Sequence, residues 1–169
     1  MSELGQMLQT LKQPEYFHVL LNPMPVYGLA CGLLGLIVAL ILKSRPAQIV
    51  ALVLVFCACA SVWPVVRTGH RGYDRVYSMS NGDGQRWLEV HADRAEEGEY
   101  VYYLAGALAL ATILIPWKFP RTAKPLLIVT LLCSLAALAA GVWISHAGGQ
   151  VRHSEFRNGP PPKVEERRD

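Results

Sequence analysis

The chain has 169 residues, a formal net charge of +3 and 52% apolar residues. That apolar content is unusual for a soluble domain and ordinary for a protein that crosses a membrane several times. The length favours a single domain, and the small net charge gives no indication of a nucleic-acid partner.

The first 18 residues predict an interfacial amphipathic segment. Proline disfavours helix in the residue before it, so Gln13–Pro14 ends the predicted helix. The segment lacks a basic start, a continuous apolar core and a cleavage site, so we expect no signal peptide and a position along the membrane surface. Its apolar residues recur every three or four positions: Leu4, Met7, Leu8 and Leu11.

Four apolar stretches of nearly bilayer length follow, and none contains Lys, Arg, Asp, Glu or His. About 20 helical residues cross the hydrocarbon core, and these sequences do not alternate as barrel strands do. We therefore expect an all-α fold, a four-transmembrane-helix antiparallel bundle formed by residues 19–157. The predicted spans are residues 25–42, 49–66, 100–116 and 126–144.

The charges outside the spans predict an orientation. All 13 acidic residues lie on the side of the termini and the long loop. The positive-inside rule then makes the short connections cytoplasmic and places both termini and the long loop outside, although that side also carries 11 basic residues. The short connections contain five basic residues and no acidic one: Lys43, Arg45, Lys118, Arg121 and Lys124.

The long extramembrane loop, residues 67–99, divides into two parts. Residues 68–84 are rich in Gly, Asp, Asn and Ser and predict irregular structure, with a short helix around residues 73–79. From Gln85 the pattern becomes helical and continues into the third span, so this helix is expected to extend beyond the membrane. Residues 158–169 combine prolines with charges and predict a flexible tail.

All five histidines lie outside the four stretches. Most extramembrane residues share their expected side, so sidedness alone carries little weight. However, four different helices would each present an imidazole near one end of the bundle, where helix bundles commonly hold cofactors. This indicates a haem b site. Its iron ligands would come from His70, His91 and His146, with His153 close by and Arg71 or Arg152 near the propionates.

Two local patterns support this site, and each also has an ordinary interpretation. In Thr68–Asp74, a His-Arg pair stands between glycines just outside the second span, as in a binding loop or in any polar loop. In Ser145–His153, His146 is expected to end a helix that the pair Gly148–Gly149 breaks. No nucleophile–base arrangement is visible, so the chain is at most an electron-transfer subunit and not an enzyme with a catalytic motif.

Three pieces of the sequence resemble a group of small bacterial four-helix membrane proteins that share a domain of unknown function. The pieces are Phe17-His18 through Gly28, then His91, then His146-Ala147-Gly148-Gly149 through His153. The resemblance spans residues 17–157 and implies haem binding through the histidines, in the bacterial cytoplasmic (inner) membrane. Asn22 stands where the family tends to have a second histidine, which argues against a second haem near the first span.

We therefore expect a redox-associated membrane subunit with one b-type haem, passing electrons between a quinone or membrane oxidoreductase and an outward-facing carrier. The alternative is a cofactor-free accessory subunit of a larger membrane complex. The small residues Gly28, Gly32 and Gly35 support it, because they allow close helix packing. A transporter has little support, since the spans contain no ionisable residue.

Overall fold

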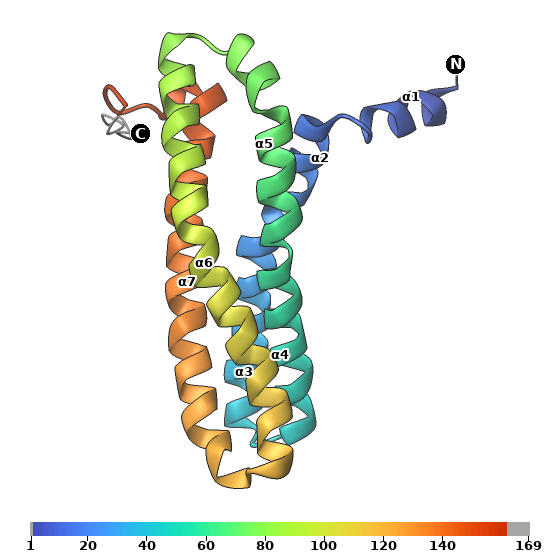
Figure 1. Cartoon of the computed structure of the whole chain (residues 1–169), viewed down its shortest axis with the longest axis vertical. Coiled ribbons are helices and arrows are strands. Elements are labelled where there is room, and N and C mark those ends of the chain that lie inside the picture. Colours follow the sequence, from blue (N-terminus) through green and yellow to red (C-terminus); the bar gives the residue numbers. More distant parts are fainter. Residues whose placement is uncertain (1, 162–169) are drawn as a thin grey trace.

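Four long helices dominate a computed structural model, which describes residues 2–161 (Figure 1). Each is long and apolar enough to cross a membrane, which confirms the prediction of four apolar helices of membrane length. Each contains one of the four predicted stretches, apart from Leu42 at the end of the first, and they comprise residues Pro14–Ile41, Arg45–Ser78, Gly82–Lys118 and Pro120–Arg152. The described part of the chain is all-α and contains no strand.

Several of these long helices consist of shorter elements. Between α2 and α3 lies the π-helical turn η1, where Pro23 and Pro25 remove two amide donors. The elements in chain order are α1 (Glu3–Thr10), α2 (Pro14–Leu21), η1 (Met24–Gly28), α3 (Leu29–Ile41), α4 (Arg45–Ala60), α5 (Val62–Ser78), α6 (Gly82–Lys118), η2 (Pro120–Thr122), α7 (Ala123–Arg152) and η3 (Ser154–Phe156).

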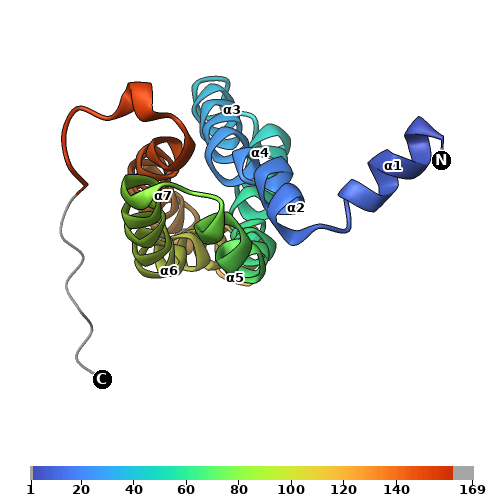
Figure 2. The same cartoon turned by 90° about the horizontal axis from the view of Figure 1, so that it is seen from above.

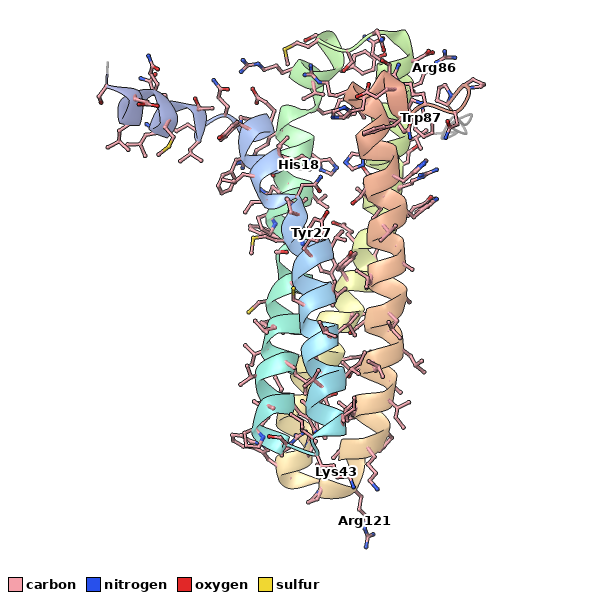
Figure 3. All side chains as sticks on the ribbon, turned by 180° about the vertical axis from the view of Figure 1, so that it is seen from behind. His18, Tyr27, Lys43, Arg86, Trp87 and Arg121 are labelled. Carbon is pink, nitrogen blue, oxygen red and sulfur yellow. The ribbon has the colours of Figure 1, made fainter. Side chains whose placement is uncertain are left out.

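Side-chain caps mark where two of the helices begin. The Asn81 side chain accepts a hydrogen bond from the Gly84 amide at 2.8 Å and starts α6. Ser44 caps α4 in the same way, after the left-handed residue Lys43 has reversed the chain. Lys43 and Arg121 lie at the end of the molecule opposite Arg86 (Figure 3).

The helices pack most closely in the half that contains these basic connections. There α3 packs on α4, α4 on α6, and α6 on α7, around buried side chains that include Leu36, Leu52 and Val55. The hydroxyl groups of Thr112 and Thr130 form a 2.7 Å hydrogen bond between α6 and α7. These two threonines therefore satisfy each other inside an otherwise apolar core.

In the other half of the molecule α2 packs on α5, and α6 packs on α7 (Figure 1). The prediction of irregular structure for residues 68–84 is wrong, because α5 continues to Ser78 and only residues 79–81 connect it to α6. Glycine weakens an exposed helix, but Gly72 lets α2 approach closely: a Cβ there would lie 2.9 Å from the Glu15 Cα.

The end of the fourth span also differs from the prediction. The Gly148–Gly149 pair does not break the helix, and α7 continues to Arg152. Helix three does extend well past its apolar stretch: α6 has 37 residues, about 55 Å at 1.5 Å per residue. Of the predicted tail, residues 162–169 lie outside the described part of the chain.

The predicted amphipathic segment, residues 1–18, is divided in the structure. Helix α1 projects sideways from the other helices and buries none of its residues (Figure 2). Helix α2 begins at Pro14 and belongs to the long first helix, so His18 lies in the packed part of the molecule.

A pair of glycine substitutions tests the packing of α3 against α4. At Gly32 an added Cβ would lie 2.9 Å from the Val55 Cγ2 and 3.0 Å from its backbone nitrogen, whereas at Gly35 the closest atom is 3.6 Å away. We expect Gly32→Ala to destabilise the protein by about 1–3 kcal/mol through overpacking. Gly35→Ala should leave the thermal midpoint unchanged or raise it, measured by circular dichroism in detergent. Equal midpoints for both variants would contradict the close contact.

Candidate cofactor-binding site

Two histidines from opposite halves of the chain meet between the helices. His18 comes from α2 and His91 from α6, and their ring centroids lie 6.3 Å apart with an angle of 77° between the planes. His18 projects from α2 towards the α6 and α7 pair (Figure 3). Seventy-two intervening residues separate the two positions in sequence, so only the fold brings them together.

Each imidazole is anchored by a backbone carbonyl of the neighbouring helix. The His18 Nδ1 lies 2.8 Å from the Val65 carbonyl oxygen of α5, and the His91 Nδ1 lies 3.1 Å from the Ile144 carbonyl oxygen of α7. A carbonyl oxygen can only accept, so each Nδ1 carries the proton and donates. Each Nε2 therefore keeps a free lone pair, which is the form in which histidine binds a metal.

A glycine one turn after each of these carbonyls makes room for the ring. A Cβ on Gly69 would lie 3.1 Å from two atoms of the His18 ring, and a Cβ on Gly148 would lie 3.1 Å from two atoms of the His91 ring. Both imidazole rings therefore lie directly against the backbone of the helix packed beside them, α5 for His18 and α7 for His91. The arrangement is the same in the two halves: a carbonyl, and a glycine four residues later.

Burial favours the uncharged form of both imidazoles. His18 and His91 precede the uncharged stretches by seven and nine residues. Desolvation lowers the pKa of each ring below its ordinary value, and this outweighs the hydrogen bonds to Val65 and Ile144, which raise the pKa. At neutral pH both imidazoles are therefore mainly uncharged.

The two histidines line one cavity of about 710 Å³, which falls within the usual range of about 300–1,000 Å³ for cofactor pockets. Its walls come from α2, η1, α5, α6 and α7. Apolar side chains dominate the inner part of the wall, although Glu99, which accepts a hydrogen bond from Tyr103, also lines it one turn from Tyr102. The other charged lining residues lie at the outer rim. The inner wall includes Pro25, Val26, Val62, Val66 and Tyr102.

The rim carries two arginines in different situations. Arg75 forms an ion pair with Glu15 at 2.6 Å, which links α5 to α2. Arg152, at the end of α7, lines the cavity, is exposed and forms no salt bridge within residues 2–161. It is therefore the guanidinium that remains available to an anionic group of a ligand in this cavity.

The other histidines proposed from the sequence are not paired with His91. His70 lines the cavity, but its side chain is 55% exposed and its Nε2 lies 3.3 Å from the Glu96 carboxylate. His146 packs edge-on against Trp87 and lines a second, smaller pocket. His153 lies at the outer end of the cavity, where its Nδ1 is 2.9 Å from Glu155.

The two arginines proposed from the sequence lie in different places. Arg152 lines the cavity, whereas Arg71 is exposed and does not contribute to its wall. Among the predicted site residues, the structure therefore brings together His91, Arg152, His70 and His153 around one cavity, and places His146 and Arg71 elsewhere.

Sequence reasoning did not place His18 among the ligands, although a signal for it was present. His18 and His91 occupy equivalent positions, each shortly before an odd-numbered span. Gly69 and Gly148 are likewise equivalent, each three or four residues after an even-numbered span. The chain therefore repeats one order of features in its two halves, and comparison of the halves would have singled out His18.

The donor set restricts what the cavity can hold. Within residues 2–161 no group of three or more His, Cys, Asp or Glu side chains gathers as a metal site. A bare metal ion usually takes more than two protein ligands, whereas a haem iron in a cytochrome needs only its axial ones. Two neutral imidazoles in a mainly apolar cavity fit a haem better than a bare metal ion.

Comparisons with known proteins add no family to this geometry. No family model matches the chain, and no curated protein or solved structure matches it. The resemblance to small bacterial four-helix proteins stays a prediction from the sequence motifs.

Nitrogen chemical shifts test the assigned tautomers. In ¹⁵N-histidine-labelled protein in detergent, we expect His18 and His91 to carry their proton on Nδ1. An ordinary histidine is half protonated at pH 6.5, but the pKa of these two is lowered, so both should remain mainly neutral there. The variants His18→Gln and His91→Gln assign the signals. A proton on Nε2, or a charged ring at pH 6.5, would contradict the hydrogen-bond assignment.

Proposed function

We propose that this chain is a multi-pass protein of a bacterial inner membrane that binds one b-type haem and takes part in electron transfer. The iron ligands would be His18 and His91, which revises the ligand set expected from the sequence. The chemistry supplied by a bound haem is the reversible uptake of one electron. The chain's own part is to orient two imidazoles, shield the ring from water and neutralise its acidic groups.

The spacing of the histidine pair is the observation that carries this proposal. Two imidazoles that bind one metal from opposite sides, with metal–nitrogen bonds of about 2.0–2.1 Å, have centroids roughly 6.4 Å apart. The His18 and His91 centroids are 6.3 Å apart. Each ring donates from Nδ1 to a carbonyl, which fixes its orientation and makes Nε2 a better ligand.

The cavity provides the second support. Its inner wall is mainly apolar, which suits the hydrocarbon edge of a haem, and its rim carries Arg152, which has no salt-bridge partner among residues 2–161. An arginine pairs well with a carboxylate through two parallel hydrogen bonds. We therefore assign Arg152, and not Arg71, to the propionate side of the site.

Aromatic residues on α5 and α7 indicate where this site lies relative to the bilayer. Arg67 lies over the Trp63 ring at 5.6 Å, and Arg94 lies over the Trp143 ring at 4.3 Å. Tryptophans that pair with arginines are typical of the membrane–water interface. The histidine-binding carbonyls are within two residues of these tryptophans, so the haem would lie at the interface and exchange electrons on that side.

The finer topology belongs to the same proposal. The four long helices would cross the bilayer as an antiparallel bundle, with the basic connections in the cytoplasm. Both termini and the outer part of α6 would then lie in the periplasm, together with the rim of the cavity. The redox partner would be a membrane oxidoreductase, a quinone or an outward-facing carrier.

A cofactor-free accessory subunit of a larger membrane complex is the second candidate. Helix α1 favours it, because Leu4, Met7 and Leu8 are exposed on a helix that buries none of its residues. Such a face would bind a partner helix as well as a lipid surface. The spectrum of the purified protein distinguishes the two candidates.

Histidine substitutions test the ligand assignment. Purified wild-type protein, or protein supplemented with haem, should show a Soret band and the paired visible bands of a low-spin haem after reduction. We expect His18→Ala and His91→Ala to lose the low-spin spectrum, because each removes one of the two imidazoles that would hold the iron. His146→Ala, outside the cavity, should keep it. Circular dichroism serves to check that each variant is folded.

Other results would point to other conclusions. Loss of the low-spin spectrum in His70→Ala or His146→Ala, with retention in His18→Ala, would restore the ligand set expected from the sequence. A wild-type protein without a Soret band, even after haem supplementation, would contradict the haem proposal and favour the accessory subunit.

A matched pair of arginine variants tests the propionate side. Arg152→Gln should weaken haem binding about 2- to 5-fold, because an exposed ion pair contributes at most about 1 kcal/mol. Arg71→Gln is the control, since Arg71 is exposed away from the cavity. Haem titration of the apoprotein measures both. Equal losses for the two variants would indicate general electrostatics instead of a direct contact.

A further inference from the structure

The inner end of the cavity contains a polar group that the haem proposal does not use. Tyr102 lines the cavity from α6, and only 2% of its surface is exposed. Its hydroxyl group is buried and has no hydrogen-bond partner within residues 2–161. A buried hydroxyl without a partner costs about 1–3 kcal/mol, so such groups in native proteins are normally matched by a ligand or a water.

The surroundings of this hydroxyl group are apolar and narrow. It lies against Gly141 of α7, where an added Cβ would overlap with it. Pro25, Val26 and Val62 complete this end of the cavity wall. A ligand that satisfies Tyr102 must therefore present one acceptor atom on an otherwise apolar body.

The position of Tyr102 indicates where such a ligand comes from. Tyr102 belongs to the uncharged stretch of residues 100–116, which is about 11 residues or roughly 16 Å along α6 from His91. The cavity also borders a weakly packed side of the molecule. Helix α7 packs on α6, α3 and η1 but makes no extensive contact with α2, although both helices line the cavity. We expect a lipid-soluble molecule to enter between these two helices, at the level of the membrane interface.

We propose that the inner end of the cavity binds the head group of a lipid-soluble quinone, with the Tyr102 hydroxyl donating a hydrogen bond to one quinone carbonyl oxygen. A quinone combines a flat apolar ring, a carbonyl acceptor and solubility in the bilayer. The inference deepens the proposed function by naming its membrane partner, and the redox meaning of the quinone site rests on that function. The binding itself depends on Tyr102 and not on the histidine pair.

Quinone titration of the full-length protein in lipid-free detergent tests this site. Decylubiquinone is the probe, and calorimetry or the quenching of tryptophan fluorescence is the readout. We expect saturable binding by the wild type. Tyr102→Phe should weaken it about 3- to 10-fold, as expected for the loss of one hydrogen bond. Without quinone, Tyr102→Phe should be at least as stable as the wild type, because it removes an unpartnered hydroxyl.

Two controls make the result specific. Tyr100→Phe changes a tyrosine two residues away that is 68% exposed and does not line the cavity, so it should bind like the wild type. Decylbenzene has the same tail without carbonyl groups and should bind more weakly than the quinone. Equal affinity for the two probes, or for the wild type and Tyr102→Phe, would overturn the proposal and leave a buried water as the partner of Tyr102.

The spectrum of the same sample separates this inference from the haem proposal. Quinone binding by a protein that shows no Soret band even after haem supplementation would support the Tyr102 site and contradict the haem. A Soret band without saturable quinone binding would keep the haem and overturn the quinone site. In nanodiscs made of phospholipid alone, a lipid ester could occupy the site first. Quinone binding that displaces this ester would also support a carbonyl acceptor at Tyr102.

Discussion

The docking of each histidine depends on a glycine placed one helical turn beyond a carbonyl. Inside a helix a carbonyl already accepts from the amide four residues later, and the side chain there covers its second lone pair. Gly69 and Gly148 have no side chain to do so, although the Thr68 hydroxyl also reaches the Val65 carbonyl at 3.0 Å. The His18 and His91 rings can therefore reach the Val65 and Ile144 carbonyls and lie against bare backbone. This docking requires two glycines within helices. Packing and hydrogen bonds compensate for their low helix propensity.

This docking also explains why the two ends of the molecule differ. At the end with the basic connections, small residues such as Gly32 let α3 and α4 interlock, and Thr112 joins α6 to α7 through Thr130. At the other end each histidine occupies the space between helices of its own half. Helix α2 packs on α5 and α6 packs on α7, and α5 also contacts α6, where Tyr73, Val76 and Tyr77 pack against the cluster around Trp87, so the two halves enclose a cavity. The rings thus act both as spacers and as the polar groups of that cavity.

Much of the fold could be predicted from the sequence, because hydrocarbon-length uncharged helices leave few alternatives in a bilayer. The site was harder to predict from the sequence. His91 and Arg152 were identified, but His18 was assigned to a surface segment, since Gln13–Pro14 suggested a boundary and Pro14 in fact begins the helix. Gly69 was interpreted as part of a polar or binding loop, and the Gly148–Gly149 pair as a helix break. Local propensity favours that interpretation, and only the contact with a distant imidazole overrides it.

The repeated order of features has a consequence for the origin of the architecture. Each half contains two helices long and apolar enough to cross a membrane. Two crossings per half would bring each half back to the side it started from, so the halves could be related by an axis perpendicular to the bilayer. A polypeptide of about half this length, with one imidazole ahead of its first crossing and one glycine past its second, would enclose an equivalent cleft by pairing with an identical copy. After fusion of two such units, each half can acquire its own residues. Tyr102, which belongs to the second half only, is an example.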